Sequence, residues 1–96
     1  MILLNVTYKV KSGQREAFYQ AVCDAKVPEL SRAEAGNIKY DYYLSVDDAD
    51  TILLIEHWKD AEAFKLHTEE EHFKLLGKIK DEYVAETIIG KYEVEA

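Results

Sequence analysis

The sequence predicts one small α+β domain spanning residues 1–96. Three observations support this class: strand-like alternation at both ends of the chain, two long stretches with helical spacing, and a central run that is apolar on both faces. Hydrophobic residues make up 48% of the chain, which is enough for a core. The length fits one domain and not two.

The first half of the chain contains one strand and one helical stretch. Residues 2–10 alternate between two faces, as a half-buried strand does. From Gln14 to about Glu34 apolar residues recur every three or four positions, which predicts a helix. Pro28 lacks a backbone donor, so we expect a kink or short break just before it. Gly36 and Asn37 tolerate a left-handed conformation and are expected to end the helix.

The second half contains two strands joined by a turn, then further helices and a last strand. The run Ile52-Leu53-Leu54-Ile55 is apolar on both faces, which is typical of a strand covered on both sides. Asp60 is placed to cap the helix that follows. The elements are a tyrosine-rich strand at 38–46, an acidic turn at 47–50, a strand at 51–58, a short helix after 60, a helix at about 70–83 and a strand at 84–94.

The resulting order β-α-β-β-α-β predicts a ferredoxin-like fold, in which helices cover one face of a four-stranded antiparallel sheet. The first and third strands are apolar on both faces, so the second sheet face also needs a cover. The simplest cover is the same sheet of a second copy, which predicts a symmetric homodimer.

The composition argues against several classes of partner. Asp and Glu outnumber Lys and Arg by 19 to 12, and the net charge of −7 argues against a nucleic-acid or anionic-membrane surface. No stretch approaches the roughly 20 apolar residues of a membrane span. The single cysteine, Cys23, permits no internal disulfide and is expected to be a small helix filler. These features favour a cytoplasmic protein.

The end of the third strand carries the most conspicuous polar residues. Alternation places Glu56 and Trp58 on one face and His57 on the other. Asn5 interrupts an otherwise apolar part of the first strand. In a ferredoxin-like order the first and third strands are neighbours, so we expect Asn5 and Trp58 to line one cavity.

The two remaining histidines do not suggest a metal centre. His67 and His72 are five residues apart, which on a continuous helix separates them by about 140°. The i, i+4 spacing of helical zinc ligands is absent, and we predict no metal. His67 can equally cap its short helix, and His72 can lie on the surface of the next helix.

The stretch 55–73 resembles the antibiotic biosynthesis monooxygenase (ABM) domain family. That family shows a Glu-x-Trp strand end, an alanine in the following helix, a histidine nine residues after the tryptophan, and a second histidine followed by an aromatic or apolar residue. Glu56, Trp58, His67 and the pair His72-Phe73 occupy these positions. The segment 34–40 also resembles the family's glycine turn before the second strand.

The resemblance implies a dimeric α/β barrel with a pocket between helices and sheet in each subunit. Several members of the family oxidise aromatic quinols or polyketides with O2 as co-substrate and without a metal or flavin. Such a reaction needs a base and polar donors. The resemblance therefore implies His67 as base or proton shuttle, with Asn5 and Trp58 as hydrogen-bond donors. The expected substrate-binding residues are Glu56, Phe64, His72, Tyr40 and Tyr42.

The family supports other chemistry, and fold alone does not select among its reactions. Some members degrade haem with an Asn, Trp and His set, which Asn5, Trp58 and His67 loosely resemble. Others isomerise small signalling sugars. A non-enzymatic dimeric protein that binds a small molecule or serves a stress response is the third alternative.

Overall fold

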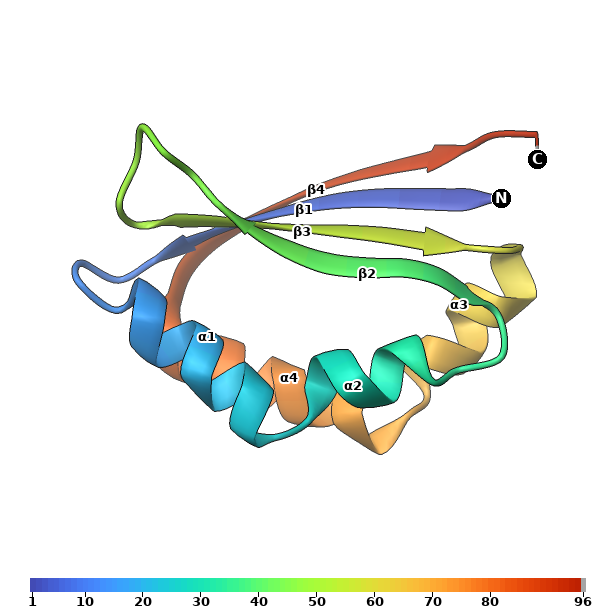
Figure 1. Cartoon of the computed structure of the whole chain (residues 1–96), viewed down its shortest axis with the longest axis horizontal. Helices are drawn as coiled ribbons and strands as arrows, with labels where there is room; N and C mark the ends of the chain where they lie inside the picture. The colour runs from blue at the N-terminus through green and yellow to red at the C-terminus, as the bar shows by residue number, and fades with distance from the viewer. Residues whose placement is uncertain (96) are drawn as a thin grey trace.

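The computed structural model describes residues 1–95. One antiparallel sheet has the strand order β2-β3-β1-β4, and the helices all lie on one of its faces (Figure 1). This confirms the predicted α+β, ferredoxin-like fold, with two helices in each helical region. The elements are β1 (Ile2–Val10), α1 (Arg15–Asp24), α2 (Val27–Arg32), β2 (Asn37–Leu44), β3 (Thr51–Trp58), α3 (Ala61–Thr68), α4 (Glu71–Tyr83) and β4 (Val84–Glu93).

The break expected before Pro28 separates α1 from α2. Lys26 has a left-handed backbone with φ of 61°, so the chain turns there before Pro28 occupies the first turn of α2. Asp60 caps α3 as expected, because its carboxylate accepts a hydrogen bond of 2.8 Å from the backbone N–H of Ala63. These two local signals fix where the helices begin.

The expected role of Gly36 and Asn37 is wrong. The preceding helix already ends at Arg32, and neither Gly36 nor Asn37 has a positive φ. A Cβ at Gly36 would instead collide with the Ala63 side chain. Glycine is needed here because the chain entering β2 passes directly against α3.

Gly36→Ala is therefore expected to destabilise the fold by about 1–3 kcal/mol, the usual cost of overpacking. Gly77→Ala is the matched control, because a Cβ at Gly77 meets nothing within 4 Å and alanine favours a helix interior by up to about 1 kcal/mol. Urea unfolding of both variants measures the difference. Equal stability of the two variants would contradict the close packing at Gly36.

The core lies between the sheet and the helices. It is built from alternate residues of β1 and β3, from Tyr40 of β2 and from apolar side chains of all four helices: Ile2, Leu4, Val6, Tyr8, Val10, Ile52, Leu54, Trp58, Phe18, Val22, Val27, Ala63 and Leu76. The half-buried Cys23 lies outside this cluster.

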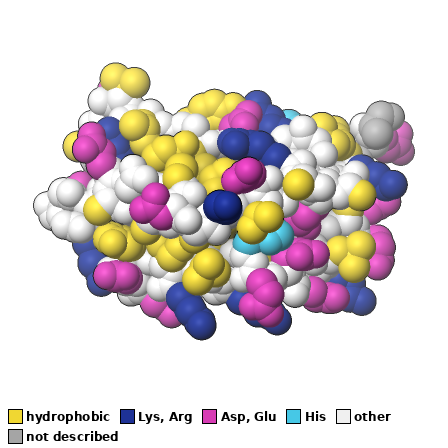
Figure 2. Space-filling model, turned by 60° about the horizontal axis from the view of Figure 1, so that its bottom comes forward, with side chains coloured by type: hydrophobic (Ala, Val, Ile, Leu, Met, Phe, Trp, Pro, Cys, Tyr) yellow, Lys and Arg dark blue, Asp and Glu magenta, His cyan; other side chains and the backbone are white. Residues whose placement is uncertain are grey.

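The opposite sheet face is not covered by any element of residues 1–95 (Figure 1). Leu53 and Ile55 lie on it and are half-buried, and the register of β4 against β1 adds the exposed side chains of Ile88 and Tyr92. In contrast, the helical side presents interspersed acidic, basic and apolar side chains (Figure 2). The helices within residues 1–95 are all too short or too polar to cross a bilayer.

Candidate functional site

The end of β3 places two functional side chains under the helices. Glu56 and Trp58 face the core and are buried, whereas His57 lies on the opposite face and is half-buried, as alternation predicts. The Trp58 indole Nε1–H donates a hydrogen bond of 3.1 Å to Glu56 Oε1. Trp58 therefore holds one oxygen of the Glu56 carboxyl group in place.

The expectation that Asn5 and Trp58 line one cavity is wrong. The strands are neighbours, but the register pairs Leu4 with Glu56 and Asn5 with Ile55. Asn5 consequently points to the uncovered sheet face, where it is exposed. A shift of one residue in register reverses the face on which a side chain lies.

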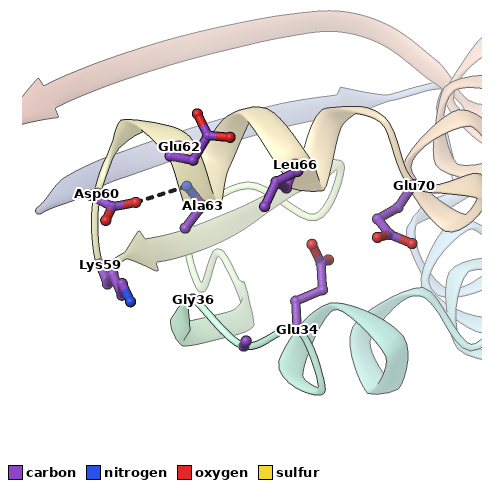
Figure 3. A pocket seen from close by; sticks show the side chains of 9 residues that line it. Glu34, Gly36, Lys59, Asp60, Glu62, Ala63, Leu66 and Glu70 are labelled. Carbon is purple, nitrogen blue, oxygen red and sulfur yellow. Dashed lines mark hydrogen bonds between the residues drawn. The ribbon is translucent and has the colours of Figure 1, made fainter.

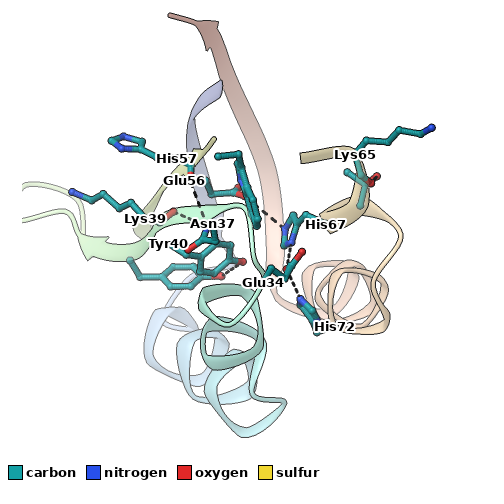
Figure 4. Close-up of polar contacts among 12 residues, drawn as sticks. Glu34, Asn37, Lys39, Tyr40, Glu56, His57, Lys65, His67 and His72 are labelled. Carbon is teal, nitrogen blue, oxygen red and sulfur yellow. Dashed lines mark hydrogen bonds and ion pairs between the residues drawn. The ribbon is translucent and has the colours of Figure 1, made fainter. Parts of the chain in front are cut away.

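His67 forms the centre of a buried polar cluster (Figure 4). Its Nδ1 lies 2.6 Å from Glu34 Oε2, and Nε2 of His72 lies 2.8 Å from the same oxygen. A carboxylate only accepts hydrogen bonds, so both imidazole N–H groups donate to it. His67 and His72 are 1% and 7% exposed. The alternative that His72 lies on the surface of its helix is therefore wrong.

The two histidines meet because α3 ends at Thr68 and α4 begins at Glu71. The predicted angle of about 140° between the two side chains applies only to one continuous helix. The turn between α3 and α4 interrupts the helix, so that angle does not apply. Glu34, which follows α2 and joins the two imidazoles, was assigned no role from the sequence. No spacing pattern connects residue 34 with residue 67, although Glu34 begins the segment that resembles the family's glycine turn.

Burial and neighbouring charge set the protonation of the cluster. Burial lowers the pKa of His67, and the Glu34 carboxylate opposes this effect. The imidazole is therefore neutral at neutral pH, with the proton on Nδ1 and the lone pair on Nε2. That Nε2 lies 3.7 Å from Glu56 Oε1. Burial also raises the pKa of Glu56 to about 7, against the opposing hydrogen bond from Trp58.

A cavity of about 170 Å³ lies beside His67 and Glu56. His67, Glu56 and Phe64 were predicted to face a pocket, and all three line it. Tyr8, Phe73, Gly77 and Lys80 also line it and were not predicted. The remaining lining residues are Leu4, Val6, Leu76 and Ile89.

The other predicted residues, Trp58, Tyr40, Tyr42 and His72, do not line this cavity. The Trp58 ring stacks against His67 with centroids 4.4 Å apart, and the Tyr40 ring lies 5.9 Å from His67. The hydroxyls of Tyr40 and Tyr42 are 3.5 Å apart, and burial raises the pKa of both groups. Trp58 and Tyr40 therefore pack against the His67 ring, and Tyr42 packs against Tyr40.

A second hollow of about 280 Å³ lies between the segment that enters β2, which includes Glu34, and α3 (Figure 3). It is larger, but Lys59 is its one basic residue among the four carboxylates of Glu34, Asp60, Glu62 and Glu70. Aromatic side chains are found at the smaller cavity, so we assign the binding of an aromatic ligand there. The hollow gives Glu34 a route to solvent.

The cluster of Glu34, His67 and His72 is also the arrangement most able to hold a metal among residues 1–95. One donor atom from each lies within 4.8 Å of the others. Two ligands of a tetrahedral zinc ion would be about 3.3 Å apart at ordinary bond lengths. The separations of 2.6 and 2.8 Å are instead those of hydrogen bonds, so the absence of a metal stays our prediction.

Comparison with known proteins shows the family. The family model described as "Antibiotic biosynthesis monooxygenase" matches residues 1–76. A Bacillus subtilis (strain 168) protein, "Putative monooxygenase YcnE", is 39% identical over 74 residues, which cover 77% of this chain and 76% of that protein.

Solved structures agree with this match. "Putative antibiotic biosynthesis monooxygenase from Nitrosomonas europaea" has a TM-score of 0.88 and 27% identity, covering 98% of both chains. PA3566 from Pseudomonas aeruginosa has a TM-score of 0.87 and 26% identity, covering 99% of this chain and 94% of that one. The fold, the Glu-x-Trp strand end and the two buried histidines thus occur together in a chain that belongs to the antibiotic biosynthesis monooxygenase family.

Proposed function

We propose that this protein is a cofactor-independent monooxygenase that oxidises a small aromatic quinol with O2. The observation that carries the proposal is the neutral imidazole of His67, which is held at Nδ1 by Glu34 and lines an aromatic cavity beside Glu56. A base held in this way suits the removal of a phenolic proton. The cavity of about 170 Å³ suits a substrate of one or two rings.

The reaction balances without a further reductant. Nε2 of His67 takes the proton of one quinol hydroxyl, and the phenolate transfers an electron to O2. Recombination forms a carbon–oxygen bond to the ring and gives a hydroperoxide, which loses water to leave a hydroxyquinone. One oxygen atom of O2 enters the product and the other leaves as water.

Each polar neighbour has a defined task in this sequence. Glu34 stabilises the imidazolium that forms when His67 accepts the proton, as a buried carboxylate does in hydrolase triads. Glu56, whose pKa burial raises to about 7, is able to give a proton to the peroxide oxygen and recover it. Trp58 fixes the Glu56 carboxyl group through its indole N–H.

The test is O2 uptake by chelator-treated protein supplied with naphthoquinols. We expect uptake above the rate of autoxidation and one atom of ¹⁸O from labelled O2 in the quinone product. Gly77→Leu fills the cavity from α4 and should abolish the enhancement without unfolding the protein. Formation of hydrogen peroxide with unlabelled quinone would contradict oxygen insertion, and loss of activity with the chelator would contradict cofactor independence.

We also infer that the protein is a cytoplasmic homodimer that pairs through the uncovered sheet face. Leu53→Lys places a charge at the centre of this apolar face, so light scattering should report twice the chain mass for the wild type and the single mass for the variant. Leu66→Lys, exposed on the helical side, is the control and should remain dimeric. A monomeric wild type would contradict the inference.

A further inference from the structure

One lysine stands at the end of the cavity away from the acid–base pair. Lys80 of α4 is half-buried and lines the cavity, and its Nζ lies 5.4 Å from the centroid of the Tyr8 ring, which also lines it. Glu56 pairs across the sheet with Leu4. The backbone of Tyr8 lies four residues further along β1, about 13 Å from that of Leu4 at the usual rise of a strand.

The helix gives a similar separation along the backbone. Phe73 of α4 packs edge-on against His67 with centroids 5.2 Å apart. Lys80 follows seven residues later, which is about two turns or roughly 10 Å along the same side of a helix. The cavity therefore has a proton-accepting end at His67 and a cationic end at Lys80.

The Lys80 ammonium has no carboxylate partner within 4.0 Å among residues 1–95, where the ion-paired lysines are Lys9 and Lys74. This is notable in a chain whose acidic residues outnumber its basic ones by 19 to 12. The positive charge of Lys80 also lowers the pKa of Glu56, so its field extends through the cavity. A half-buried cation without a partner is suited to an anionic ligand.

Gly77 opens the space in front of this lysine. It lies one turn before Lys80 in α4 and lines the same cavity. A Cβ at Gly77 would meet nothing within 4 Å, so packing does not require glycine there, although glycine in a helix interior costs about 1 kcal/mol. The missing side chain therefore adds room for a ligand.

We propose that the cavity selects an aromatic substrate that carries an acidic group, such as a carboxylate, at the end of the molecule opposite the reacting hydroxyl. The hydroxyl meets His67, the ring lies against Gly77, and the acidic group pairs with Lys80. This orientation rests on the proposed function, whereas the preference for an anion rests on Lys80 alone.

The test compares 6-hydroxy-2-naphthoate with its uncharged analogue 6-hydroxy-2-naphthamide by isothermal titration calorimetry. We expect the wild type to bind the acid about tenfold more tightly than the amide, as a partly buried charge pair would produce. The preference should shrink as ionic strength rises. Lys80→Met should remove the preference and keep the amide affinity, because methionine retains the apolar stem of lysine.

Lys78→Met is the matched control, because Lys78 is exposed on α4 and does not line this cavity; it should keep the full preference. Equal affinity of the wild type for acid and amide, or a preference that survives Lys80→Met, would overturn the proposal, as would binding of neither probe. Turnover of a neutral naphthoquinol separates the two hypotheses. Turnover without acid preference rejects only the role of Lys80, and acid preference without turnover rejects only the oxidation.

Discussion

His67→Gln is expected to lower kcat for quinol oxidation by about 10²- to 10⁴-fold, the usual contribution of a positioned base. The amide of glutamine can still donate a hydrogen bond to Glu34, so the buried carboxylate keeps a partner. The glutamine amide cannot accept the phenolic proton at neutral pH. The loss should therefore appear in kcat, while the affinity for a phenol that is not oxidised changes little.

His57→Gln is the matched control for this variant. His57 is adjacent to Glu56 and Trp58 in β3 but lies on the other sheet face, so the substitution should leave kcat near the wild-type value. The kcat of Glu34→Gln should lie between those of the His67 and His57 variants. The glutamine holds His67 in position but lacks the negative charge that stabilises protonated His67. Wild-type activity of His67→Gln would show that the base is another group.

Glu56→Gln is expected to stabilise the protein increasingly as pH rises. Burial raises the pKa of Glu56 from 4.5 to about 7 in the folded state. Between these pH values the folded protein holds a proton that the unfolded chain has released, so raising the pH lowers the free energy of unfolding of the wild type. The contribution of this group to stability is complete below pH 4.5 and is lost as pH passes through 7.

Glutamine removes this ionisation while keeping the shape of the side chain. The advantage of Glu56→Gln over the wild type should therefore grow by roughly 2 to 3 kcal/mol between about pH 5 and about pH 8. The lowered pKa of His67 has the opposite effect on the pH dependence of stability, because folding favours its neutral form. Both proteins contain His67, so this effect largely cancels in the difference between them. Urea unfolding across this range measures the difference. A difference that does not vary with pH would mean that Glu56 is ionised throughout.

Local patterns were sufficient for the elements and for one half of the site. Alternation in β3 correctly separated Glu56 and Trp58 from His57, and the break before Pro28 followed from backbone chemistry. A capping residue or a proline acts on its own neighbours, so such signals can be read from the sequence.

Contacts between distant segments could not be predicted in the same way. Whether Asn5 shares a face with Trp58 depends on the register of β1 against β3, which alternation within each strand does not define. The meeting of Glu34 with His67 and His72 depends on the turn between α3 and α4 and on the path of the chain after α2. Gly36 was likewise expected to end the helix, whereas its role depends on a contact with Ala63, which lies far away in the sequence.

The ionisation of a phenol bound beside His67 tests the central proposal most directly. A two-ring phenol that is not oxidised and whose own pKa is close to that of an imidazole, such as a nitronaphthol, should be titrated with protein under anaerobic conditions at a pH about one unit below that pKa, and its absorption spectrum recorded. We expect the phenolate band to appear on binding to the wild type and to His57→Gln, and to be absent with His67→Gln. A bound phenol whose spectrum remains that of the neutral form in the wild type would contradict the assignment of His67 as the base.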